Sequence, residues 1–150
     1  MSAQGAPSIV FPSVEWFQQL QESVNNDPEF RRLGNVDAVM GVKVGEKVFV
    51  ITFEAFECTG VKEGTEYDLI DADFFLEMTM EQWRELIANT SRNGGADLSH
   101  TLNTLDLMID GGICRNATGD QLRADLFFRV NQSLQHFFDS SASLNTVFPE

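Results

Sequence analysis

Apolar residues recur at helical spacing most clearly in residues 121–139. At about 100° per residue, most apolar side chains of this stretch fall on one broad arc, made up of Leu122, Leu126, Phe127, Val130, Leu134, Phe137 and Phe138. Asp120 precedes the stretch and is suited to accept the first free backbone N–H groups of a helix. The pattern predicts one long helix whose wide apolar face lines either an ordinary core or a cavity. Phe128 lies off the arc and is expected to be a second-face contact or a partner site.

Three more stretches carry helical spacing. Ser13 is placed to cap a first helix, whose apolar side consists of Trp16, Phe17, Leu20 and Val24, and a short second turn starts at Asp27-Pro28. Thr79 and Gln82 form a capping-box pattern before a helix with an apolar face of Met80, Trp83, Leu86 and Ile87. A further helix is predicted from Leu98, Leu102, Leu105 and Ile109, with glycines at 111 and 112 ending it.

From residue 37 the period changes to two, which predicts strands. Residues 37–44 and 47–53 read as a hairpin around a tight turn at Gly45-Glu46. In its second strand Phe49, Ile51 and Phe53 face one way, while Val48, Val50 and Thr52 face the other. Both faces of that strand are therefore expected to be covered. Residues 55–61, 72–78 and 113–118 are the remaining predicted strands, and 62–65 a turn.

This order of elements predicts an α+β fold, with a mainly antiparallel five-stranded sheet and helices packed on one side. The 150 residues suit a single domain over 1–150. Its core is expected at about 13–139, with residues 1–12 as a flexible arm and 140–150 as a flexible tail.

Charge and composition narrow the classes of partner. The net charge of −13 would be repelled by phosphate backbones and by anionic membrane surfaces, so nucleic acid is a poor partner. No apolar run approaches the roughly 20 residues that span a bilayer, and the first residues lack a leader pattern. We therefore expect no stable membrane insertion and a cytoplasmic location. Cys58 and Cys114 stand alone and are expected to be small buried hydrophobes.

Motifs for catalysis or cofactor binding are lacking in the sequence. It contains no nucleophile elbow, P-loop or dinucleotide-binding glycine pattern, and no cofactor is implied. His100 is expected in solvent and His136 near the end of the last helix, and neither has metal-ligand spacing with other residues. Asp73 and Glu77 lie beside an apolar strand, where a carboxyl group could have a raised pKa, although such acids more often face water.

Several stretches together are similar to one known family. They are VEWFQQL at 14–20, DPEFRRLG at 27–34, the hairpin VMGVKVGEKVFVITF at 39–53, ADFFLEMTMEQWRELI at 72–87 and GGICRNATGD at 111–120. With the order of elements, these resemble the sterol carrier protein two-like family of lipid-binding domains. Two features depart from the family pattern: residues 115–118 are polar where a short basic strand is usual, and residues 93–100 are an insertion.

The resemblance implies a twisted sheet with helices on one face, enclosing a tunnel for a sterol, a fatty acid or an acyl-CoA thioester, and it implies no catalytic residue. The predicted lining of such a cavity is Phe49, Ile51, Phe53, Phe75, Trp83, Leu102, Leu105, Phe127, Leu134 and Phe137. Two alternatives stay open. One is a small enzyme acting on a hydrophobic substrate with Asp73 or Glu77 as general base, and the other is an accessory subunit with a protein partner or a second copy of itself.

Overall fold

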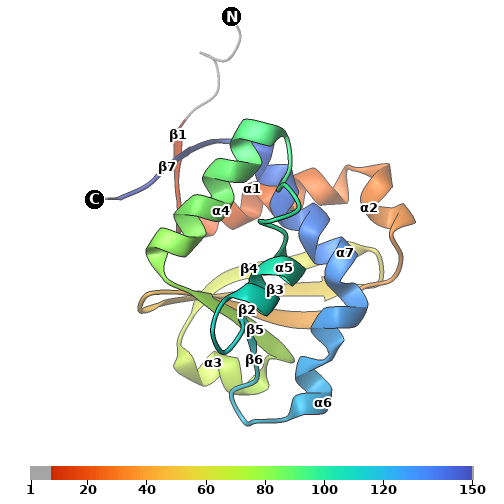
Figure 1. Cartoon of the computed structure of the whole chain (residues 1–150). Coiled ribbons are helices and arrows are strands. Elements are labelled where there is room, and N and C mark those ends of the chain that lie inside the picture. Colours follow the sequence, from red (N-terminus) through yellow and green to blue (C-terminus); the bar gives the residue numbers. More distant parts are fainter. Residues whose placement is uncertain (1–7, 150) are drawn as a thin grey trace, which may run out of the picture.

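A computed structural model describes residues 8–149 of the chain, which form one five-stranded sheet, one two-stranded sheet and a set of helices (Figure 1). The larger sheet has the order β4-β3-β2-β5-β6. Its strands are β2 (Ala38–Val44), β3 (Lys47–Glu54), β4 (Glu57–Gly64), β5 (Phe74–Met78) and β6 (Cys114–Arg115). β2 and β5 run parallel, and the other neighbours are antiparallel. The predicted α+β class with a mainly antiparallel five-stranded sheet is confirmed.

Most of the helices cover one face of this sheet (Figure 1). In chain order the helices are α1 (Val14–Asn25), α2 (Pro28–Arg32), α3 (Glu66–Asp71), α4 (Met80–Asn93), α5 (Leu102–Met108), α6 (Gln121–Ala124) and α7 (Leu126–Asp139). The main core lies between the sheet and α1, α4 and α7. It contains Trp16, Met40, Phe49, Trp83 and Phe137, each at most 1% exposed.

The helix starts follow the side-chain chemistry of the sequence. Ser13 Oγ accepts from Trp16 N at 3.1 Å at the start of α1. Thr79 and Gln82 form the expected capping box, with bonds of 2.9 and 3.1 Å. At α6, Asp120 Oδ1 accepts from Arg123 N at 3.2 Å. These bonds satisfy N–H groups that a helix start leaves without a partner.

The second face of the sheet is also covered, by a helix that the sequence pattern did not predict. α3 follows β4 and places Leu69 against Val48 and Phe75 on the side away from the main core (Figure 1). Gly41 lets α3 approach closely, because a Cβ atom there would meet Leu69 Cδ2 and the Phe75 Cβ atom. The prediction of helices on one side therefore holds for the larger helices, with α3 as the exception.

The predicted long final helix is divided in two. α6 ends at Ala124 and α7 begins at Leu126, with Asp125 between them. As a result Leu122, expected on the apolar arc, is 82% exposed on α6, whereas Phe127, Val130 and Leu134 of α7 are buried.

Within the described range, the segments expected as arm and tail include two short strands. β1 (Ser8–Val10) pairs in parallel with β7 (Asn145–Val147). Phe11 is fully buried, with its ring 4.7 Å from that of Trp16, and Trp16 Nε1 donates to Thr146 Oγ1 at 3.0 Å. Burial of Phe11 and this bond hold both ends against α1. Residues 1–7 and 150, also part of the expected arm and tail, lie outside the described range.

Candidate ligand-binding groove

The residues predicted to line a cavity mostly meet in the main core. Eight of them are at most 1% exposed there: Phe49, Ile51, Phe53, Trp83, Leu102, Phe127, Leu134 and Phe137. Leu105 is half-buried and packs against the same core. Phe75 does not join them. Successive residues of a strand point to opposite faces, so Phe75 turns toward α3 while Phe74 and Leu76 face the core.

These core rings are in direct contact with one another. Phe137 packs edge-on against Phe53 with ring centroids 5.3 Å apart, and Phe127 packs in the same way against Phe74 at 5.8 Å. Trp83 lies 5.7 Å from the ring of Phe138, and its Nε1 donates to Lys43 O at 3.1 Å. In this state the space between α7 and the sheet is filled by side chains.

An apolar groove opens at the surface between α4 and α5, with a volume of about 450 Å³. Leu105, Met108 and Ile109 supply its apolar wall. Leu105 and Ile109 also pack against the main core, so two of the residues that line the groove contact that core. Glu81, Gln82, Glu85, Ser99 and His100 form its polar rim. This volume is within the range of small-molecule sites, roughly 300–1,000 Å³.

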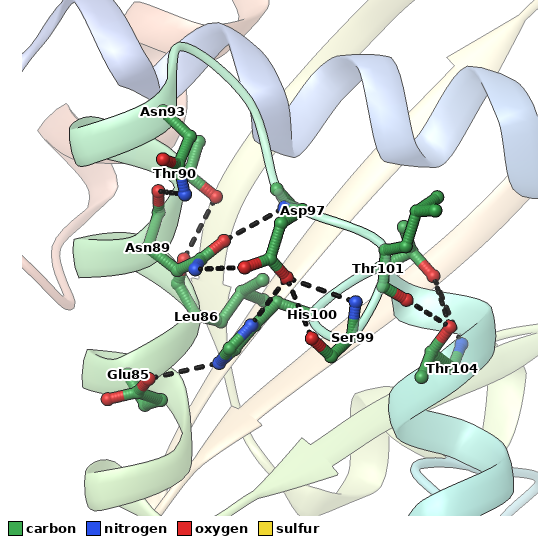
Figure 2. A network of polar contacts seen from close by, with 12 residues as sticks. Glu85, Leu86, Asn89, Thr90, Asn93, Asp97, Ser99, His100, Thr101 and Thr104 are labelled. Atoms are coloured by element: carbon green, nitrogen blue, oxygen red, sulfur yellow. Dashed lines mark hydrogen bonds and ion pairs between the residues drawn. The ribbon is translucent and has the colours of Figure 1, made fainter.

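A polar network fixes the loop that joins α4 to α5 beside this groove (Figure 2). Asp97 accepts from Asn89 Nδ2 at 2.9 Å and from Ser99 N at 3.0 Å, and its Oδ1 lies 2.8 Å from His100 Nδ1. On the other side of the ring, His100 Nε2 is 3.0 Å from Glu85 Oε2. His100 is thus held between two carboxylates, and the expectation of a simply solvated histidine is wrong.

The same contacts shift the pKa values of the network. The hydrogen bond to Asp97 raises the pKa of His100 above its ordinary value, against the opposing effect of burial. The hydrogen bonds from His100 and Asn89 hold the pKa of Asp97 well below its usual range. Both shifts favour the charged pair, so the loop is linked to α4 by a charge-assisted contact.

α5 itself is only partly packed. Leu102 is its buried residue, while Leu107 and Met108 are 77% and 70% exposed. Its start is held by Leu102 N, which donates to Gln135 Oε1 of α7 at 2.7 Å, and by the Thr101 cap. A helix with so little buried apolar surface belongs to the less stable part of a fold.

The two carboxylates considered as general bases hold neighbouring elements together. Asp73 Oδ2 accepts from Val39 N at 2.8 Å, and its Oδ1 is 3.3 Å from Arg123 Nη2. Glu77 pairs with Arg115 at 3.3 Å and with Lys43 at 3.7 Å. Neither residue lines the groove between α4 and α5, although Glu77 borders a smaller hollow of about 280 Å³ nearby.

Sequence reasoning missed the groove and its network. The apolar spacing predicted a helix through Leu98, Leu102, Leu105 and Ile109, but Leu98 is 88% exposed and precedes α5. The available signal was Asp97, which stands three residues before His100 in a polar connection and has the side chain suited to an Asx turn.

Two further observations concern metal binding and membrane insertion. Within residues 8–149, no set of three His, Cys, Asp or Glu side chains is placed to hold a metal ion. No helix in that range has the length and apolar character required to cross a bilayer.

Comparison with known proteins finds a similar fold among solved structures. No family model and no curated protein matches the chain. The similar fold is that of a conserved hypothetical protein from Thermus thermophilus, TT1886, which was solved in solution and is described as "possibly sterol carrier protein". The two share 16% identity with a TM-score of 0.54, over 92% of this chain and 93% of that one. At this identity the likeness shows the fold alone.

Proposed function

We propose that the protein binds and carries a hydrophobic, lipid-like molecule whose apolar chain enters at the groove between α4 and α5. The observation that carries this proposal is the position of the groove. Its apolar wall includes Leu105 and Ile109, which belong to the weakly packed α5 and its C-terminal cap and pack directly on the main core. The fold shared with a protein described as a possible sterol carrier supports the same class of ligand.

Outward movement of α5 would connect the groove with the core. Such a movement exposes chiefly Leu102 and Leu105, which costs about 3–6 kcal/mol at about 1.5–3 kcal/mol for each side chain. An acyl chain that buries ten methylene groups gains about 8 kcal/mol at about 0.8 kcal/mol each. The gain from burying such a chain offsets the cost of moving α5, before the roughly 4–15 kcal/mol of lost translational and rotational freedom on association is counted.

The charge at the rim selects among lipid-like ligands. Glu81 and Glu85 lie at the groove, and the chain carries a net charge of −13. His100 is the only cationic group among the groove residues, and its contacts with Asp97 and Glu85 already engage both ring nitrogens. A ligand with a neutral polar end is therefore favoured over one with a carboxylate or phosphate.

Dye displacement tests the proposal with a matched pair of ligands. Nile red, a neutral apolar dye, is titrated into the protein and then displaced by decanol or by decanoate, which differ in charge at one end. We expect saturable binding of the dye and better displacement by decanol. Met108→Ser should weaken dye binding about tenfold, equal to about 1.4 kcal/mol. Leu122→Ser is the control, because Leu122 is 82% exposed on α6 and outside the groove.

Three results would contradict the proposal: no saturable dye binding, equal weakening by Met108→Ser and Leu122→Ser, or binding unchanged in both variants. Preferential displacement by decanoate would leave the groove in place but contradict the assignment of a neutral ligand.

A further inference from the structure

A second, more polar groove lies on the other side of α5. It has a volume of about 730 Å³ and runs along α7, which contacts both α2 and α5 (Figure 1). Phe128, Gln132, Gln135 and Asp139 follow one another along the lining face of α7. The eleven helical steps from Phe128 to Asp139 correspond to about 16 Å of groove at 1.5 Å per residue. The volume is larger than the 450 Å³ of the apolar groove, and the lining differs from it in chemistry.

Amide side chains dominate the hydrogen-bonding capacity of this groove. Asn103, Asn131 and Gln132 line it, and among residues 8–149 their side chains make no hydrogen bond. Each carries both donors and an acceptor, so it can pair with groups that both donate and accept. Gln135 is already engaged, since it accepts from Leu102 N and donates to Asp139 Oδ1 at 2.9 Å.

An aromatic ring stands at one end of the amide row. Phe128 is 50% exposed, and its ring packs edge-on against the buried Phe127 at 5.1 Å. The Phe128 ring thus contacts Phe127 on one side, while half of the residue's surface stays accessible. The face of an aromatic ring is electron-rich and attracts weakly positive C–H groups, such as those on the face of a sugar ring.

Most charged residues that line this groove already form an ion pair or a hydrogen bond with a neighbouring residue. Glu29 pairs with Arg32 at 2.9 Å, and His136 Nε2 lies 2.7 Å from Asp27 Oδ2. Asp139 accepts from Ala96 N at 3.0 Å. Arg129 makes no ion pair within the described range. One guanidinium near two carboxylates gives the groove no strong preference for an anion or a cation.

We propose that this groove binds a neutral, hydroxyl-rich ring, that is, a saccharide or a sugar-like group. Hydroxyl groups both donate and accept, as do the amide groups of the solvent-accessible Asn103, Asn131 and Gln132, and a sugar ring has an apolar face that suits Phe128. An apolar chain would leave these amides without partners, and a polyanion would be repelled by a chain of net charge −13. The inference is independent of lipid binding, because the two grooves share no residue.

Nitrogen NMR of the side-chain amide groups tests the inference directly. Labelled protein is titrated separately with glucose, galactose, N-acetylglucosamine and maltose. We expect at least one sugar to shift the amide signals of Asn103, Asn131 and Gln132 saturably. Phe128→Ala should weaken that binding about fivefold, the effect of one aromatic contact, and Gln132→Ala should weaken it as well. Tyr67→Ala is the matched control, because Tyr67 is 81% exposed on α3, on the opposite side of the sheet.

The titration distinguishes the alternatives. The proposal is overturned if no sugar gives a saturable shift, or if Phe128→Ala and Gln132→Ala, both with native backbone spectra, bind as tightly as the unchanged protein. It is also overturned if inorganic phosphate or triglycine shifts these amides saturably and the sugars do not, since an anion or a peptide would then be the occupant. Decanol should leave the three amide signals in place whether or not it binds the apolar groove.

Discussion

Phe137→Ala is the substitution that best tests how completely the interior is filled. Phe137 is fully buried on α7, and its ring contacts those of Phe53 at 5.3 Å and Phe138 at 5.4 Å. Truncation would remove the ring from a packed setting and leave a cavity that the surrounding elements close only in part. Substitutions of this kind cost about 3–5 kcal/mol.

This cost is large relative to the stability of the whole domain. Domains unfold with about 5–15 kcal/mol, and for chains of about 150–250 residues each kilocalorie lowers Tm by about 2–4 °C. We therefore expect Phe137→Ala to lower the free energy of unfolding by about 4 kcal/mol and Tm by about 8–16 °C. Urea and thermal unfolding followed by circular dichroism measure both. Leu122→Ala, at an 82% exposed position, should change stability by less than about 0.5 kcal/mol.

A small loss for Phe137→Ala would refute the reasoning. If the variant lost less than about 1.5 kcal/mol, the ring would border empty space rather than packed neighbours. The predicted lining residues would then surround a preformed cavity, and ligand entry would need no movement of α5.

Further predictions concern the loop network, the close approach of α3 and the cysteines. An NMR titration should give His100 a pKa above about 6.5, and Asp97→Asn should lower it. Because the pKa of His100 is raised in the folded protein, its contribution to stability is complete below about pH 6.5 and is lost as the pH rises through the pKa of the folded state. A His100 pKa at its ordinary value would contradict the network. Gly41→Ala should destabilise by about 1–3 kcal/mol, because the new Cβ meets Leu69 and Phe75, and a change under about 0.5 kcal/mol in urea unfolding would contradict the packing of α3. Burial raises the pKa of both Cys58 and the partly buried Cys114 to about 12, so alkylation at pH 8 should be slow until the chain unfolds, and rapid labelling of Cys58 in the native protein would contradict its burial.

Local patterns along the chain were sufficient to predict most elements of the fold. Ser13, Thr79 and Asp120 cap helices as their positions indicated, and the hairpin around Gly45 has the predicted register of Phe49, Ile51 and Phe53 toward the core. These features depend on residues close in sequence, where spacing and side-chain chemistry are decisive.

The errors arise where the outcome depends on distant contacts. α3 was missed because its six residues offer one buried side chain, Leu69, and the helix gains its stability by packing over Gly41. Phe75 was assigned to the ligand space although strand alternation with Phe74 and Leu76 placed it on the opposite face. The apolar groove was not predicted either, because the exposure of Met108 depends on how α5 packs beside α4.

The methyl signal of Met108 reports most directly on lipid entry at the groove between α4 and α5. Protein labelled with carbon-13 at the methionine methyl groups is titrated with decanol. Met108 is 70% exposed at the groove, whereas Met40 is fully buried in the main core and reports on the interior. We predict a saturable shift of the Met108 signal, and also of the Met40 signal if the decanol chain passes beneath α5. A Met108 signal that does not move would contradict lipid entry at this groove, whether or not decanol binds at another place on the protein.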